Sequence, residues 1–74
     1  DTSVFARAAL AKTLASRKSG GVGLLKRLAS DDSAIVRGFV ATSSSNPEML
    51  GTLVGLAGDH DPETRRLAVI SLGS

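Results

Sequence analysis

The chain has 74 residues, 42% of them hydrophobic and 22% charged, so it is too apolar for a disordered segment and long enough for one small domain. It has no cysteine, which excludes disulfides, thiolate metal sites and a cysteine nucleophile, and which suits a cytoplasmic protein. The apolar runs are too short to span a bilayer and no signal-peptide pattern is visible, so no membrane partner is expected. Because the first residue is aspartate rather than methionine, we expect residues 1–74 to be a single domain cut from a longer protein.

The net charge of +2 is unevenly distributed along the chain. Residues 1–30 carry a net charge of +5, whereas residues 31–74 carry −3. Such asymmetry can mark an anion-binding end, although ordinary solvated helix faces produce the same pattern. The candidate anion-binding residues flank one loop and are Arg17, Lys18, Lys26 and Arg27.

Two helices are predicted in the first part of the chain. The first covers about residues 2–15, with Thr2 or Ser3 as a candidate N-cap. A Ser-Gly-Gly sequence then breaks the pattern, and the second helix is predicted at about residues 21–29. The residues expected to face the core are Val4, Phe5, Ala8, Ala9, Ala11 and Ala15, followed by Leu24, Leu25 and Leu28.

The third helix is predicted at about residues 34–44, with Ser33 as its N-cap. Its apolar residues form one stripe that is expected to be buried. They are Ile35, Val36, Phe39 and Val40.

The strongest start signals precede the last two helices, predicted at about residues 47–57 and 62–72. Asn46-Pro47-Glu48 and Asp61-Pro62-Glu63 each place a capping side chain before a proline and an acid in the first turn. The expected core residues are Met49, Leu50, Leu53 and Leu56, then Leu67, Ala68, Ile70 and Leu72. No strand pattern competes with these five helices, so the predicted fold class is all-α.

A short sequence phrase occurs twice, 28 residues apart. Leu28-Ala29-Ser30-Asp31 followed by Val36-Arg37 recurs as Leu56-Ala57-Gly58-Asp59 followed by Thr64-Arg65. A repeat of this length indicates stacked helical units, and such arrays usually function by offering a binding surface. The structural repeat residues are Asp31, Val36, Arg37, Asp59, Thr64 and Arg65.

An aspartate with an apolar residue five positions on and an arginine six positions on is the signature of HEAT repeats. Over residues 28–69 the chain resembles short HEAT-like repeats, and it is also similar to leucine-rich repeat variants. The resemblance implies a short α-solenoid of stacked antiparallel helix pairs, with about five helices in two and a half repeats and right-handed superhelical stacking.

The repeated acid is expected in the turn between two helices, with the arginine early in the second helix. There Asp31 and Asp59 can accept hydrogen bonds from free backbone N–H groups and from an arginine of the same or an adjacent unit. The alternative is that Arg37 and Arg65 face outward and bind an anionic partner. The structural role is favoured because the pair recurs together and balances charge locally.

Other candidates for chemistry are few. His60 lies between two aspartates, but no second histidine or cysteine completes a metal-ligand set, so a solvated turn histidine is the favoured interpretation. Residues 43–45 are a serine run and residues 19–23 are glycine-rich; they are interpreted as a polar linker and a flexible turn. No catalysis, no cofactor and no metal are predicted.

The sequence therefore favours a non-catalytic module for protein–protein interaction or scaffolding. Its partner would be another protein or neighbouring repeats of the same protein, with self-association through the last helix as one form of this. The alternative is nucleic-acid backbone binding through the basic loop at residues 17–27. Against that alternative, the only aromatic residues, Phe5 and Phe39, fit the core pattern. A third, weaker hypothesis is regulation of an enzyme in the same longer chain.

Overall fold

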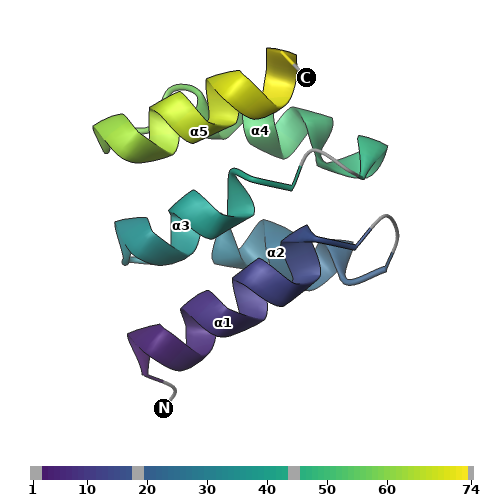
Figure 1. Ribbon diagram of the computed structural model, residues 1–74, viewed down its shortest axis with the longest axis vertical. Helices are drawn as coiled ribbons and strands as arrows, with labels where there is room; N and C mark the ends of the chain where they lie inside the picture. Colours follow the sequence, from purple (N-terminus) through teal and green to yellow (C-terminus); the bar gives the residue numbers. More distant parts are fainter. Residues whose placement is uncertain (1–2, 18–19, 44–45, 74) are drawn as a thin grey trace.

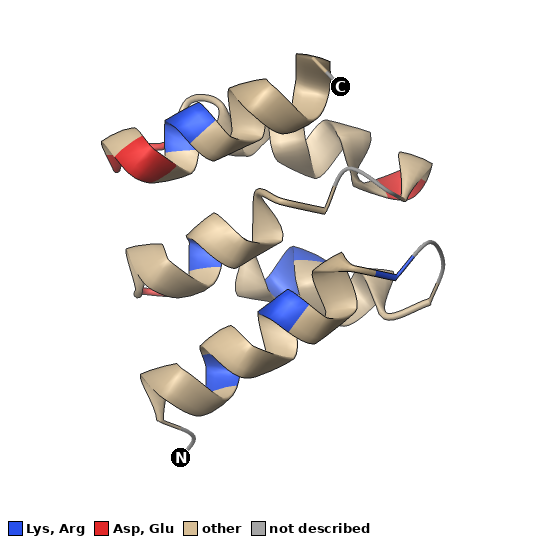
Figure 2. Ribbon diagram, viewed as in Figure 1, with Lys and Arg blue, Asp and Glu red and all other residues tan. Residues whose placement is uncertain are grey.

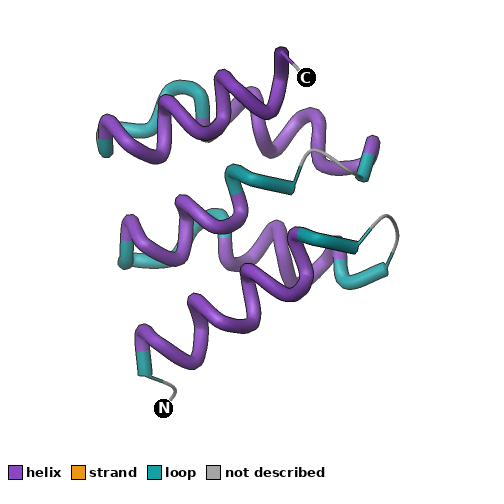
Figure 3. Tube along the Cα trace, in the orientation of Figure 1, coloured by secondary structure: helices purple, strands orange, loops and turns teal. Residues whose placement is uncertain are grey.

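A computed structural model of the protein describes residues 3–17, 20–43 and 46–73. Within these residues the chain forms five α-helices and one 3-10 turn and has no strand, which confirms the all-helical prediction (Figure 3). The elements are α1 (Val4–Ala15), α2 (Val22–Leu28), α3 (Ala34–Val40), the 3-10 turn η1 (Pro47–Met49), α4 (Leu50–Leu56) and α5 (Pro62–Gly73).

Capping side chains begin three of these elements. The Ser3 hydroxyl accepts the Ala6 N–H of α1 at 3.1 Å, whereas Thr2 lies outside the described residues. Asn46 Oδ1 accepts the Glu48 N–H at 3.0 Å, and Asp61 Oδ2 accepts the Thr64 N–H at 2.9 Å. The two proline-containing start signals therefore lie at helix starts, because each satisfies N–H groups that have no partner within the helix.

Two boundaries and one cap differ from the predictions. Ser33 is the N-cap residue of α3 as predicted, but its side chain makes no capping bond. Helix α3 ends at Val40 rather than near residue 44. Just after this end, the hydroxyls of Thr42 and Ser43 donate to backbone carbonyls three residues earlier. The segment predicted as one helix over 47–57 begins as the 3-10 turn η1.

The helices lie in two layers. In Figure 1, α1, α3 and α5 form one row from the N-terminal to the C-terminal end, with α2 and α4 behind them. Helix α3 packs between α1 and α5, while α2 contacts α1 and α3, and α4 contacts α5. The Cα atoms span 34 × 27 × 14 Å, so the molecule is a flat two-layer slab.

The core consists mainly of small and aliphatic side chains between the layers and along the row. Its buried members include Ala8, Ala11, Leu14, Ala15, Leu25, Leu28, Val36, Val40, Ala41, Met49, Leu56 and Ala68. Alanine predominates where α1 meets α3, which allows the two helix backbones to approach closely. The expected core positions Leu25, Leu28, Val36 and Val40 are buried as predicted.

Several other predicted core residues are exposed. Phe5 is 83% exposed, and Ile35 in the predicted α3 stripe is also exposed. Leu50, Ile70 and Ala9 are also exposed, and Leu24 is 39% exposed. The predicted stripes were too wide, because each helix of a two-layer slab buries a narrow face and leaves its flanks open. Leu50 has a further reason: it follows a 3-10 turn, which has a different helical period from the α-helix.

No helix in the described part of the chain is long and apolar enough to cross a membrane.

Candidate interaction surface

Two arginine–aspartate pairs each join a helix of the row to the turn that precedes the next helix of that row. Arg7 of α1 donates from Nε and Nη2 to the carboxylate of Asp31, at 2.7 and 3.2 Å. Arg37 of α3 makes the same two bonds to Asp59, at 2.8 and 3.2 Å. The aspartates lie in the turns that precede α3 and α5, so each arginine reaches forward to the turn of the next hairpin. Such two-point contact fixes both distance and orientation.

The same aspartates also order their own turns. Asp31 Oδ1 accepts the Ser33 N–H at 2.9 Å, and Asp59 Oδ1 accepts the Asp61 N–H at 2.8 Å. Arg37 Nη1 in turn donates to the Asp31 carbonyl at 2.8 Å. Each turn is therefore held by its own carboxylate and by the arginine of the helix that follows it.

The charges of these groups are mutually stabilised. The hydrogen bond from Arg7, followed by that from the Ser33 N–H, lowers the pKa of Asp31 below its ordinary value. The hydrogen bond from Arg37 lowers the pKa of Asp59 despite partial burial, and it raises the pKa of Arg37. Arg37 is buried, so it offers little surface to an anionic partner. Its role in this structure is to join hairpins.

Val36 and Thr64 occupy the position before the repeated arginine, and both are completely buried. The Thr64 hydroxyl donates to Asp61 Oδ2 at 2.9 Å, and the Ala34 carbonyl, 3.3 Å away, shares the same proton as a second acceptor. The polar residue in the apolar place is thus satisfied by hydrogen bonds, one of them across the α3–α5 contact. The hydrogen bonds that the Thr64 N–H and hydroxyl donate to Asp61 lower the pKa of that carboxyl.

An apolar groove of about 490 Å³ lies between α3 and α5. Its walls and rim are formed by Ala34, Ile35, Gly38, Phe39, Thr42, Asp61, Glu63 and Leu67. Gly38 lines the groove without a side chain, and a Cβ atom there would narrow it by making an ordinary contact with Leu67 Cδ1, at 3.6 Å. Sequence reasoning missed this groove, although a glycine between the bulky residues of a helix stripe is a signal that could have indicated it.

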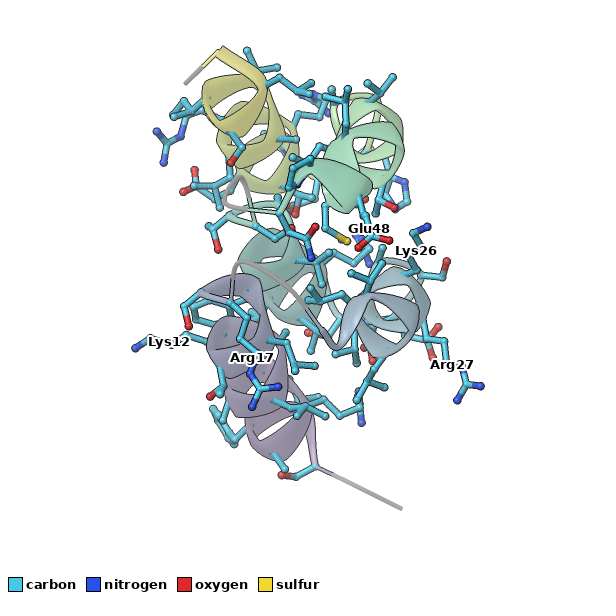
Figure 4. The ribbon with its side chains drawn as sticks, turned by 90° about the vertical axis from the view of Figure 1, so that its right-hand side faces the viewer. Lys12, Arg17, Lys26, Arg27 and Glu48 are labelled. Atoms are coloured by element: carbon cyan, nitrogen blue, oxygen red, sulfur yellow. The ribbon has the colours of Figure 1, made fainter. Side chains whose placement is uncertain are left out.

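The basic residues around the 17–27 loop do not gather into one patch. Figure 4 shows Arg17 over α1 and Arg27 at the outer side of α2, with their guanidinium groups well apart. Lys26 lies on the α2 side near the acidic Glu48 of η1, an element that α2 contacts. Lys18 lies outside the described residues. The three described side chains therefore present separated charges rather than a continuous basic surface.

The remaining candidates have ordinary structural surroundings. His60 is exposed in the turn before α5, and the described part of the chain contains no group of histidine, cysteine and acidic residues that could hold a metal. Ser43 is buried and donates to the Val40 carbonyl at 2.6 Å, while residues 44 and 45 lie outside the described ranges. Gly20 and Gly21 adopt positive φ angles in the turn before α2.

Comparison of the chain with protein-family models, curated proteins and solved structures finds no match.

Proposed function

We propose that this protein is a non-catalytic interaction module of the HEAT-like repeat type, a short right-handed α-solenoid that binds a segment of another protein. The observation that carries this proposal is the open apolar groove between α3 and α5. Exposed apolar side chains that surround a concave surface are typical of protein-binding sites. The Arg37–Asp59 pair supports it indirectly, because it joins α3 to the turn that precedes α5, and these two helices form the walls of the groove.

The groove favours a partner segment with a bulky apolar side chain close to a basic one. Ile35, Phe39 and Leu67 supply the apolar walls. Asp61 stands at the rim and is ionised at neutral pH, since hydrogen bonds from Thr64 lower its pKa. Residues 31–74, which contain the whole groove, carry a net charge of −3. Opposite charge at the rim accelerates association and orients the ligand.

Selection of peptides from a random displayed library on the immobilised protein tests the proposal. We expect the selected peptides to combine apolar and basic residues, and to bind in the micromolar range as a single small site allows. Ile35→Asp is expected to weaken binding by at least about tenfold, because it places a charge in the apolar wall. Fluorescence anisotropy of a labelled peptide measures the effect.

Val54→Asp is the matched control for this experiment. Val54 is 59% exposed on α4, as Ile35 is on α3, but it does not line the groove. We expect this variant to bind the selected peptides as the wild type does. Peptides that tolerate Ile35→Asp and lose binding with Val54→Asp would show that another surface is used, and failure to enrich any peptide would contradict the proposal.

A further inference from the structure

Arg65 occupies the position in the sequence repeat that Arg37 occupies, but it does not form an aspartate pair like those of Arg37 and Arg7. Arg7 pairs with an aspartate 24 residues further on, and Arg37 with one 22 residues further on. Within the described residues no carboxylate lies within ion-pair distance of Arg65. Arg65 is exposed on α5, the last helix of the row (Figure 1).

Arg65 nevertheless makes a bond equivalent to the one by which Arg37 is held to the turn before its own helix. Arg37 Nη1 donates to the Asp31 carbonyl at 2.8 Å, and Arg65 Nη1 donates to the Asp59 carbonyl at 3.0 Å. In Arg37 this bond leaves Nε and Nη2 directed at the next aspartate. In Arg65 the corresponding two donors have no hydrogen-bond partner among the described residues. Nε and Nη2 of Arg65 are therefore available to bind a carboxylate.

The surface around Arg65 contains exposed apolar side chains at positions that are buried in the preceding hairpin. A shallow depression there is lined by Ala57, Pro62, Arg65, Arg66, Val69 and Ile70. Val69 is 57% exposed, whereas Ala41, 28 residues earlier at the C-cap of α3, is completely buried. The equivalent faces of α1 and α3 are covered by helices of the following hairpin.

We propose that this end face binds a further helical hairpin whose interhelical turn presents an aspartate to Nε and Nη2 of Arg65. The occupant follows from the two interfaces already present in the chain, in which an arginine on the covered face meets an aspartate in the turn of the covering hairpin. This face is separate from the α3–α5 groove, and the proposal does not depend on the groove binding a peptide.

Arg66 limits how closely such a hairpin can approach. It takes the place that Gly38 occupies on α3, where the next helix packs against the backbone. The Arg66 side chain is bonded to Glu63 of its own helix at 2.6 Å and remains largely exposed. A docked hairpin must displace this side chain, so removing it is expected to strengthen docking.

An extended chain provides the test. The sequence of residues 46–73 is appended directly after Gly73, so that the appended copy of Asp59 follows Arg65 by 22 residues, the separation found for Arg37 and Asp59. Urea unfolding is then measured for the 74-residue and the extended chains. We expect a higher unfolding midpoint for the extended chain, because neighbouring units of a stacked array stabilise each other.

Arg65→Gln is the diagnostic variant. In the extended chain we expect it to lower the folding equilibrium constant by about tenfold, since a two-point arginine–carboxylate pair is lost from a covered face. In the 74-residue chain the same substitution should change that constant by less than about threefold, because only an exposed bond to a carbonyl is lost. Changing the aspartate of the appended copy to asparagine should reproduce the loss, and combining both changes should add little to it.

Two matched controls complete the experiment. Arg17→Gln, another exposed arginine far from this face, should have an equally small effect in both chains. Arg66→Ala should raise the midpoint of the extended chain more than that of the 74-residue chain. Equal effects of Arg65→Gln in both chains, or an unchanged midpoint on extension, would overturn the proposal. So would a dimer of the 74-residue chain that Arg65→Gln dissociates, since the face would then serve a second copy.

Discussion

At the scale of single residues, the same aspartate performs two tasks. Each carboxylate accepts a backbone N–H of its own turn and the forked donors of an arginine from the preceding hairpin. The two pairs differ in exposure: the Arg7 side chain is 26% exposed, and that of Arg37 is 10% exposed. Since a buried pair loses more than an exposed one when a partner is removed, Arg37 is expected to matter more.

The pairs predict how stability depends on pH. The pKa values of Asp31 and Asp59 are lower in the folded protein than their ordinary value of 3.8. Their contribution is therefore fully present above about pH 5 and is lost as the pH falls through 3.8 toward the folded-state values. Arg37→Gln is expected to cost about 2 kcal/mol at pH 7, and this difference should shrink steadily as the pH falls toward 2.

Urea unfolding of the wild type and the variant between pH 7 and pH 2 checks this expectation. Arg7→Gln serves as the comparison and should cost less, about 1 kcal/mol at pH 7, because its pair is closer to solvent. A penalty for Arg37→Gln that stays constant down to pH 2 would show that packing of the side chain matters, and not its charge.

Sequence reasoning placed these residues only in part. The spacing of acid and arginine predicted a turn and the helix that follows it, together with hydrogen bonds from backbone N–H groups. The sequence left open whether each aspartate pairs with an arginine of its own repeat unit or of an adjacent unit. The choice is made by the distance between hairpins, since the guanidinium of Arg37 reaches the carbonyl of its own turn and the carboxylate of the next turn at the same time.

At the scale of elements, boundaries with chemical markers were the most predictable. The proline-containing starts at residues 46 and 61 carry capping bonds, because a side-chain oxygen and an imposed φ angle act locally. Asn46 shows a consequence that was not expected: its Nδ2 is buried without a hydrogen-bond partner in the described structure. The cap is therefore made at the expense of one unsatisfied donor.

The turn between α1 and α2 depends on its second glycine more than on its first. Gly21 has a φ of 71°, and a Cβ atom there would lie 2.6 Å from Leu14 Cδ2, a buried side chain. Gly20 has a φ of 84°, but its nearest neighbour to such an atom is 4.0 Å away. We expect Gly21→Ala to destabilise the protein by at least about 2 kcal/mol and Gly20→Ala by about 1 kcal/mol.

Thermal or urea unfolding of the two single variants measures this difference. Both positions have a positive φ angle that disfavours alanine, so an excess for Gly21→Ala reports mainly the contact with Leu14. Equal losses would mean that Leu14 moves aside without cost, and that the turn and the first helix pack less tightly than the distances indicate.

At the scale of the whole molecule, the fold decides which charged side chains lie close together in space, and charge along the sequence does not. Acidic residues lie in the turns that precede α3 and α5, in the first turn of α5 and in η1, and basic residues are spread along the helices (Figure 2). The +5 charge of residues 1–30 suggested one basic end, but Lys12, Arg17 and Arg27 point in different directions (Figure 4). A phosphate backbone needs several cations along one path.

We therefore expect weak binding to duplex DNA. At physiological salt its dissociation constant should be no tighter than the roughly 10⁻⁴ to 10⁻⁶ M of non-specific complexes. The combined variant Arg17→Ala/Lys26→Ala/Arg27→Ala should change it only slightly, as should the control Lys12→Ala. Fluorescence anisotropy of a labelled duplex at two salt concentrations measures both quantities. Nanomolar affinity that the triple variant abolishes would instead support the nucleic-acid hypothesis.

The sequence by itself determined the helical class, the approximate segments and the turns, because helical periodicity, capping side chains, proline and glycine act within a few residues of the chain. The tertiary structure decided which flank of each helix is buried, which hairpin each arginine reaches, and where the groove lies. Phe5 and Ile35 illustrate the difference, since an apolar position in a helix is buried only where another element covers it. That covering depends on contacts between residues distant in the sequence, which no local pattern records.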